Sequence, residues 1–454
     1  MRFVTLGLVA IALAATASCG DDEDGEEKLC ETDTEVGCVS GQVCEEVEGG
    51  DPACFDPVVV DGRVFDLVTT QGVADARVVA RDENQAAVSP IAKTDVNGAY
   101  RLTVPSKRDA KGNPVSRLVT LRADASGYQS FPTPPRVALP VDVKDAAGEK
   151  ERILKTPTTD IGLVALADTS GLGTVSGTVE TEVPMGTLVV IAGATGVADR
   201  DGTFVVFNVP AGSQTAGGYK QGINLSTAPA TVTAGQETIG IVLSETGEAT
   251  ATVSGSVQIV NASGGMSTSV ILVLEDTFDP TLIRGETPPG LRAGNVSGAF
   301  SISGVPDGKY AVLAAFENDG LVRDPDTSIG GTEVVHITVA GSSVTAGEGF
   351  KVTGALAVVS PGANDVEKVS GTPTFVWEDD SSEDEYHVTV YDALGTLVWE
   401  TTGNFDPGGS SPAEVTYGGP ALTSGMIYQF RATSIKDGTP ISSTEDLKGV
   451  FVFQ

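Results

Sequence analysis

The stretch that decides the fold begins Val60-Asp61-Gly62-Arg63-Val64 and continues, after a gap, as Asp95-Val96-Asn97-Gly98-Ala99-Tyr100-Arg101-Leu102 and Val104-Pro105. Its motifs read V-x-G-x-V, then [DN]-x-[NDS]-G-[AT]-[YF]-x-[LVI], then Val-Pro. The set recurs at Val175–Val179, Asp199–Val206 and Val209-Pro210, and again at Val253–Val257, Asn295–Ile302 and Val305-Pro306. The chain of 454 residues therefore contains three copies of one structural unit.

Each motif is interpretable as a piece of β-structure. In V-x-G-x-V both valines lie on one face of a strand, and the glycine permits a bend or a close approach. Asn-Gly and Asp-Gly favour a positive φ and predict a tight hairpin, after which the aromatic and aliphatic residues point into a core. Proline ends the strand because it cannot donate to a ladder. Each unit, of roughly 75–115 residues, is predicted to be a small antiparallel β-sandwich that folds as an independent domain.

The motif set is similar to the carboxypeptidase regulatory-like domain, a transthyretin-like β-sandwich. The first unit also carries the later A-x-G-Y of that family, at Ala125-Ser126-Gly127-Tyr128. The second unit has Gly217-Gly218-Tyr219 instead, and the third has Pro306–Tyr310 without a later Gly-Tyr. The resemblance covers residues 58–354. It implies the fold and not an activity, because in this family the domain accompanies many different modules.

The last hundred residues follow a different pattern. Strand-like alternation runs through Pro373–Trp377, Tyr386–Tyr391 and Tyr428–Ala432. Leu422, six residues before Tyr428, resembles the tyrosine corner of a fibronectin type III-like sandwich, and Trp377 on an early strand is typical of the same fold.

The N-terminus resembles a bacterial lipoprotein leader. The run Leu6–Ala17 is apolar but shorter than the roughly 20 residues that span a bilayer, so it has the size of a signal-peptide core. Small residues followed by Cys19 resemble a lipobox, whose cysteine is acylated and becomes the first residue of the mature protein. Thr16 stands where leucine is usual, and the alternative is an ordinary secretory signal with an incidental cysteine. Gly20 is not the aspartate that signals inner-membrane retention, which favours the outer membrane, facing outward.

Four further cysteines follow an acidic tether, at Cys30, Cys38, Cys44 and Cys54. An even number in an exported chain predicts two disulfides, and three pairings are open. The alternative is a small zinc site, although the spacings lack the close pair that such sites use. A segment this small needs the bridges to hold it together.

Together these features predict an all-β fold, a tandem array of small antiparallel β-sandwiches behind a short N-terminal region. The predicted divisions are 1–18 (signal peptide), 19–29 (lipid anchor and acidic tether), 30–57 (disulfide-rich segment), 58–168, 169–246 and 247–354 (three regulatory-like sandwiches) and 355–454 (fibronectin type III-like sandwich).

Charge and motif content exclude several classes of function. The net charge of −33 repels phosphate backbones, so no nucleic acid is expected as a partner. There is no H-E-x-x-H, no P-loop and no G-x-S-x-G before a helix. His336 and His387 sit in strand patterns and are interpreted as sheet-face residues. No catalytic residue and no cofactor is therefore predicted, and an unrecognised carboxylate enzyme is the minor alternative.

Two weaker site hypotheses remain. The acidic stretch with Asp379, Asp380, Glu383 and Asp384 is interpreted as a solvated loop or, alternatively, a low-affinity calcium loop. Asp199-Arg200-Asp201-Gly202 echoes the start of a calcium loop, but a turn is preferred because the later glutamate is missing. A carbohydrate-binding face would draw on Tyr128, Tyr219, Tyr310, Trp377 and Trp399, most of which are expected in cores.

The sequence therefore predicts a non-enzymatic, lipid-anchored surface protein that serves as scaffold, adhesin or binding protein. Its expected partners are the membrane and an extracellular polysaccharide or surface protein. The alternative function is polysaccharide capture.

Overall fold

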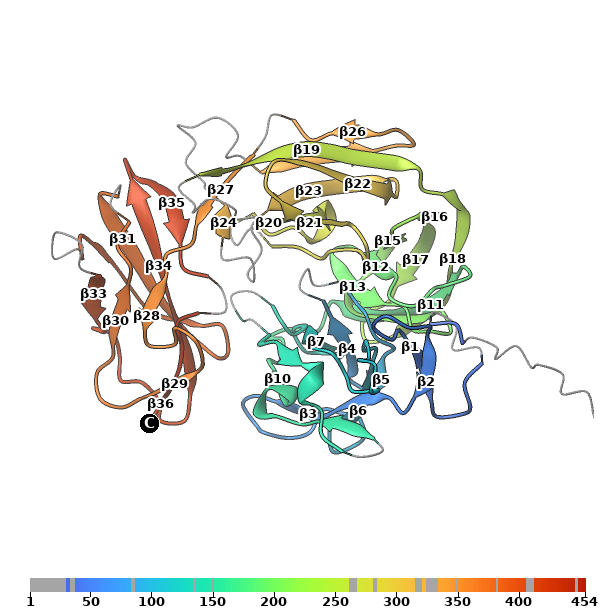
Figure 1. Cartoon of the computed structure of the whole chain (residues 1–454), viewed down its shortest axis with the longest axis horizontal. Coiled ribbons are helices and arrows are strands. Elements are labelled where there is room, and N and C mark those ends of the chain that lie inside the picture. Colours follow the sequence, from blue (N-terminus) through green and yellow to red (C-terminus); the bar gives the residue numbers. More distant parts are fainter. Residues whose placement is uncertain are drawn as a thin grey trace, which may run out of the picture.

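The computed structural model describes residues 30–32, 37–82, 86–133, 136, 138–148, 151–260, 268–280, 284–314, 321–323, 334–347, 350–380, 383–405, 412–445 and 448–454. Their regular structure is strands and three short 3-10 turns, η1 (Val143–Asp145), η2 (Pro157–Thr159) and η3 (Glu275–Thr277). The predicted all-β array of sandwiches is confirmed (Figure 1). Within the described ranges, no helix has the length and apolar character to cross a membrane.

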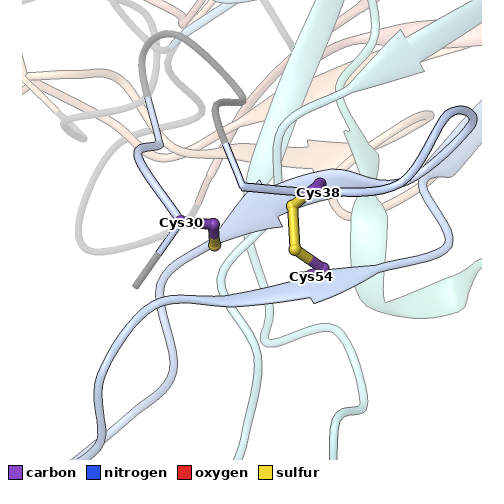
Figure 2. A group of neighbouring side chains, drawn as sticks. All are labelled: Cys30, Cys38 and Cys54. Carbon is purple, nitrogen blue, oxygen red and sulfur yellow. A yellow bond between two sulfur atoms is a disulfide. The ribbon is translucent and has the colours of Figure 1, made fainter. Parts of the chain in front are cut away.

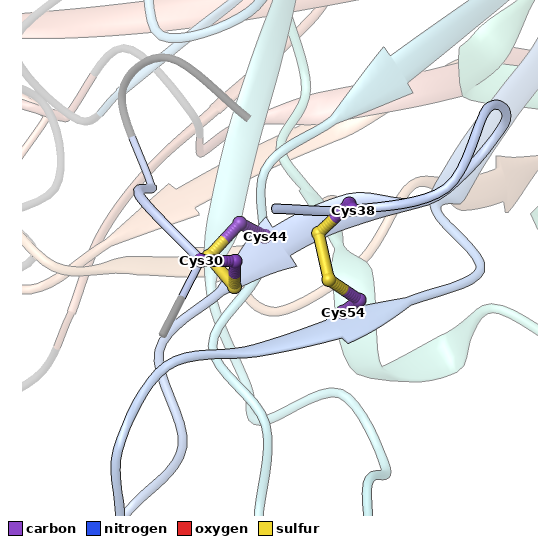
Figure 3. The surroundings of a disulfide bond; sticks show 4 residues. All are labelled: Cys30, Cys38, Cys44 and Cys54. Atoms are coloured by element: carbon purple, nitrogen blue, oxygen red, sulfur yellow. A yellow bond between two sulfur atoms is a disulfide. The ribbon is translucent and has the colours of Figure 1, made fainter. Parts of the chain in front are cut away.

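The disulfide-rich segment forms a two-stranded knob of β1 (Val43–Glu45) and β2 (Ala53–Phe55). The bridges join Cys38 to Cys54 (Figure 2) and Cys30 to Cys44 (Figure 3). Cys44 and Cys54 lie opposite each other across the two strands, so one bridge leaves each strand. The prediction of two disulfides is confirmed, and because these four sulfurs are bonded in pairs, none of the four is a thiolate that could ligate zinc.

The first sandwich packs two four-stranded sheets around one core. One sheet has the order β10-β3-β6, with β9 also on β3, and the other has the order β5-β4-β7-β8. The strands are β3 (Val58–Asp66), β4 (Arg77–Arg81), β5 (Ala92–Lys93), β6 (Ala99–Val104), β7 (Leu118–Asp124), β8 (Val141–Asp142), β9 (Arg152–Leu154) and β10 (Ile161–Leu163). The late strands β9 and β10 pair in parallel with β3, while the other pairs are antiparallel.

The second sandwich is one curled eight-stranded sheet, and the third has a five-stranded and a four-stranded sheet. The second comprises β11 (Leu172–Glu180), β12 (Leu188–Ile191), β13 (Ala194–Val197), β14 (Thr203–Pro210), β15 (Gly212–Lys220), β16 (Ile223–Leu225), β17 (Ala228–Val232) and β18 (Glu237–Glu248). The third comprises β19 (Ala251–Val260), β20 (Thr268–Leu274), β21 (Arg292–Val296), β22 (Ala299–Val305), β23 (Gly308–Ala314), β24 (Leu321–Arg323), β25 (Val335–Val339), β26 (Val344–Thr345) and β27 (Phe350–Gly354). Again the first strand pairs in parallel with a last one, β11 with β18 and β19 with β27.

The repeated motif places a glycine against a buried aromatic side chain in all three sandwiches. The central glycine of V-x-G-x-V lies opposite the aromatic residue of the second motif, as Gly62 with Tyr100, Gly177 with Phe204 and Gly255 with Phe300. The three aromatic side chains are buried and occupy the space that a Cβ on each glycine would need. The flanking valines are buried as predicted, and each strand ends at its Val-Pro pair.

The sequence predicts a tight hairpin at the Asn97-Gly98 turn, inside the second motif, and this prediction is wrong. The backbone N–H of Asp95 donates to the carbonyl of Ala99 at 2.9 Å and closes the turn, with Gly98 at φ +79°. Beyond that contact the flanking strands diverge, because β5 pairs with β4 in one sheet and β6 with β3 in the other. The turn is a corner that carries the chain from one sheet of the sandwich to the other.

The C-terminal sandwich has a three-stranded sheet, order β28-β30-β33, and a six-stranded sheet, order β29-β36-β34-β31-β32 with β35 on β34. The strands are β28 (Val358–Ser360), β29 (Glu367–Val369), β30 (Thr374–Trp377), β31 (Glu385–Asp392), β32 (Leu397–Gly403), β33 (Ala413–Thr416), β34 (Ile427–Lys436), β35 (Thr439–Ser443) and β36 (Val450–Phe453). Phe375 and Trp377 are fully buried in its aromatic core. The hydroxyl of Tyr428 accepts a hydrogen bond from the N–H of Thr423 at 2.9 Å, which gives this turn the geometry of a tyrosine corner.

The sequence predicts that the first three sandwiches are independent domains, and this prediction is wrong because they pack against one another. Leu188 and Val190 on β12 of the second sandwich belong to the hydrophobic core of the third, while Val189 and Ile191 face the core of their own sandwich. The three surround a common junction, and the C-terminal sandwich lies beside them (Figure 1). It is joined to the third sandwich by the hydrogen bond from the Ser442 hydroxyl to the carbonyl of Gly354 at 2.9 Å, since Leu356 already belongs to the C-terminal core.

Candidate functional sites

Within the described residues, the carboxylates of the acidic stretch of the C-terminal sandwich do not converge on one point, as the calcium alternative would require. Its carboxylates point to different protein partners: Asp379 accepts from the Tyr386 hydroxyl at 2.9 Å, Asp380 from Ser434 at 2.9 Å and Asp384 from the N–H of Asp437 at 2.7 Å. Among the described residues, the groups close enough to share a metal ion are cysteine sulfurs, and these are disulfide-bonded. Burial raises the pKa of Tyr386 well above its usual value, and its bond to Asp379 adds to this. The described carboxylates therefore hold the loop between β30 and β31 through hydrogen bonds to β31 and to the β34–β35 hairpin.

The two histidines lie on sheet faces, as predicted. His336 Nδ1 is 2.7 Å from a carboxylate oxygen of Glu275, and His387 Nε2 is 3.1 Å from one of Glu400. Both pairs are well exposed, so they add little to stability.

The aromatic residues considered for a sugar platform lie in cores or against them. Tyr310 and Trp377 are fully buried, and Tyr128, Tyr219 and Trp399 are half-buried. Tyr219 of the second sandwich packs edge-on against Tyr310 of the third, with ring centroids 6.4 Å apart. The large hydrophobic side chains exposed within the described residues are aliphatic and not aromatic. This arrangement gives no support to a carbohydrate-binding face.

A buried ion pair fixes the disulfide knob to the first sandwich. The Glu45 carboxylate accepts from Arg108 Nε, and it also accepts from the N–H and hydroxyl of Ser106, at 2.8 and 3.0 Å. Both charged side chains are only 2% exposed. The Arg108 guanidinium lies over the ring of Phe55 at 4.8 Å and donates to the carbonyl of Asp56 at 2.9 Å. The knob is therefore a docked part of the first sandwich.

A second polar cluster lies where the three sandwiches meet, and Arg122 on β7 contacts all of them. Its guanidinium donates to Asp124 in its own sandwich at 2.7 and 2.9 Å, to the Thr195 hydroxyl in the second at 2.7 Å and to Glu286 in the third at 2.7 Å. Arg81 on β4 donates to the other oxygen of Glu286 at 2.6 Å. Only 1% of the Arg122 side chain and 5% of the Arg81 side chain are exposed.

Burial and charge oppose each other in this junction. Burial acts to raise the pKa of Glu286, but Arg122 and Arg81 outweigh it and hold that pKa below its usual value. Burial acts to lower the pKa of Arg122, yet Asp124 and Glu286 raise it above its ordinary value. Both side chains are therefore charged at neutral pH, and each requires the other as a partner.

Further contacts tie the second sandwich to the first. Asn208 has φ +59° at a shift in register between β11 and β14. Its side chain accepts from the N–H of Gly127 at 2.9 Å and donates to the carbonyl of Tyr128 at 2.8 Å, both in the A-x-G-Y turn. Asp199 accepts from the N–H of Ile91 at 3.1 Å. The stretch that echoes a calcium loop is thus a turn that docks on the neighbouring sandwich.

A small cavity of about 280 Å³ lies between the knob, the first sandwich and the Asp199–Gly202 turn. Its walls are about equally polar and apolar, and Arg101 and Arg200 lie on its lining. Arg101 is already paired with Glu151 at 3.1 Å and with Asp61 at 3.6 Å. Cys19, the predicted lipidation site, lies outside the described residues.

Comparison with known proteins adds little. No family model and no curated protein matches the chain. Among solved structures it is similar to the Bacillus anthracis TIE protein, with 11% identity, 87% of this chain and 73% of that one covered and a TM-score of 0.15. It is also similar to BcpA, the major pilin subunit of Bacillus cereus (10% identity, 66% and 99% covered, TM-score 0.18), and to a DUF3823 family protein from Bacteroides ovatus (11% identity, 44% and 98% covered, TM-score 0.21). At such scores no property of these proteins is carried over to this chain.

Proposed function

We propose that this chain is a non-enzymatic, lipid-anchored protein of the cell surface. In this account Cys19 carries the lipid, the acidic residues that follow form a solvated tether, and the body serves as a scaffold, adhesin or binding protein facing outward from the outer membrane. The observation that carries the proposal is the pair of disulfides just after the tether, because such bridges persist in oxidising compartments outside the cytoplasm. The leader, with its small residues before Cys19, supports the same location.

The placement of chemically reactive residues supports a structural role. Four cysteines are paired, both histidines hydrogen-bond to carboxylates on sheet faces, and the buried charges at Arg108 and Arg122 bind neighbouring parts of the chain. The strongly negative charge suits a soluble extracellular surface.

Metabolic labelling with a palmitate analogue, followed by separation of the inner and outer membranes, tests the proposal. The wild-type protein is expected to carry label and to fractionate with the outer membrane. Cys19→Ala should lose both properties, and Ser18→Ala, which keeps a small residue before the cysteine, should retain them. Unlabelled wild-type protein in the periplasm or medium would overturn the proposal.

A further inference from the structure

We propose that Glu286 is an interdomain latch that makes residues 58–354 one cooperative unit, so that the three sandwiches open together and not one at a time. The proposal concerns the folded body alone and does not depend on the lipid anchor.

The latch joins segments that are far apart in the sequence. Glu286 follows η3 in the third sandwich, where its N–H donates to the Thr277 hydroxyl at 2.9 Å and its carbonyl accepts from the N–H of Leu274 at 3.0 Å. These bonds hold its backbone at the end of β20. Its carboxylate then binds Arg81 and Arg122, which project from adjacent strands of the first sandwich.

The first sandwich depends on this contact more than the other two do. The second and third share a hydrophobic core through Leu188 and Val190, and the N–H of Gly222 donates to the carbonyl of Gly304 at 2.8 Å. The outward face of β4 and β7, in contrast, presents Arg77, Arg81 and Arg122 to its neighbours, all at most 5% exposed as residues. In the closed arrangement Arg81 and Arg122 are out of water and share the Glu286 carboxylate, so removing that carboxylate would leave them buried without it.

A rigid unit would also fix how the knob lies relative to the third sandwich. The knob is docked on the first sandwich through Glu45 and Arg108, and the C-terminal sandwich is joined to the third through the hydrogen bond from Ser442 to Gly354. Because the latch connects the first sandwich to the third directly, the docked knob and the third sandwich, which leads into the C-terminal sandwich, would keep a constant relative position. The C-terminal sandwich would thus extend from a rigid unit of three sandwiches.

Hydrogen exchange on the full chain, carrying Cys19→Ala so that no detergent is needed, tests the latch. In this protein the most protected amides of β4, β7, β12 and β20 should exchange with one common opening free energy. Glu286→Gln keeps the shape but removes the charge, and it should speed exchange in β4 and β7 by roughly tenfold or more relative to β20. The matched control is Glu275→Gln in the same sandwich, which removes an exposed carboxylate and should leave this ratio unchanged.

Each outcome bears on the proposal. Faster exchange of β4 and β7 than of β12 and β20 in the unmodified body would overturn it, as would equal behaviour of the Glu286→Gln and Glu275→Gln variants. If Glu286→Gln does not fold, the milder Thr195→Val, which removes one acceptor of Arg122, provides the same comparison. Thr195→Val should speed hydrogen exchange in β4 and β7 by a smaller factor, and unchanged exchange rates there would count against the latch.

Discussion

The ring of Tyr100 covers Gly62 so closely that a Cβ added to the glycine would lie 2.6 Å from the tyrosine hydroxyl oxygen and 2.7 Å from the adjoining ring carbon, and the carbonyl oxygen of Thr159 would be nearer still, at 2.1 Å. The same hydroxyl donates to the carbonyl of Thr159 at 2.6 Å. Phe204 covers Gly177 and Phe300 covers Gly255 in the same way. The central glycine is therefore needed for space, and the aromatic residue closes the sandwich over it.

This contact predicts that Gly62→Ala destabilises the body. The Thr159 carbonyl is part of the backbone, and the Tyr100 ring is held by its hydrogen bond to that carbonyl and by the core. The extra methyl group therefore overpacks the site and should cost about 1–3 kcal/mol in the free energy of unfolding. Gly171→Ala is the control, because a Cβ there meets no atom within 4 Å. Urea unfolding of both variants checks the prediction, and equal midpoints would contradict it.

Removing the carboxylate of Glu45 should undock the knob. Glu45→Ala leaves the Arg108 charge buried without its partner, which is expected to cost about 3–5 kcal/mol. The neighbouring Glu46 pairs with Lys107 at 3.5 Å on the surface, so Glu46→Ala should change stability by only about 0.5 kcal/mol. Thermal unfolding of the two variants makes the comparison, and similar losses would show that burial of the pair is unimportant.

Reduction of the disulfides should act on the knob and on the sandwich that it touches. The bridges close loops with sequence separations of 14 and 16, and each is expected to contribute about 3 kcal/mol. Because Glu45 lies on β1 of the knob, loss of the knob also deprives Arg108 of its partner. Hydrogen exchange with and without reductant should show faster exchange in residues 37–56 and beside Arg108, while residues 355–454, which contain no cysteine, stay unchanged. A matching loss of protection in the C-terminal sandwich would argue against this account.

The junction should weaken in acid. The pKa of Glu286 in the folded protein lies below its ordinary value of 4.5, so the unfolded chain binds the proton more readily. The stabilisation is fully present above that value and is lost as the pH falls through the pKa of the folded state. Urea midpoints measured from neutral pH down to about pH 3 should therefore fall more steeply for the wild-type protein than for Glu286→Gln. Parallel curves would mean that this carboxylate does not titrate in the unfolding equilibrium.

Sequence patterns were sufficient for the parts of the fold that local geometry determines. Alternation around Val60 and Val64, the buried Tyr100 and the Val-Pro strand ends all follow from side-chain direction and backbone chemistry. The corner at Asn97-Gly98 was missed because a positive φ specifies a reversal of the chain and not the sheet that the next strand joins.

The contacts between sandwiches were harder to predict. Arg81 and Arg122 alternate with apolar residues, which is the pattern of a sheet with one face in water, and nothing local indicates that a distant Glu286 covers that face. One signal was available: Leu188–Ile191 is a continuous apolar run, which is typical of a strand buried on both faces. The partners of Asp379, Asp380 and Asp384 were hard to predict for a related reason, because a cluster of carboxylates in sequence does not fix where each one points.

The central claim, that this is a lipid-anchored surface protein, is tested most directly by mass spectrometry of the mature N-terminus. The account predicts a tryptic peptide that begins at Cys19 and ends at Lys28, with a lipid mass on the cysteine that survives reduction. A mature chain that begins elsewhere, or at an unmodified Cys19, would contradict it.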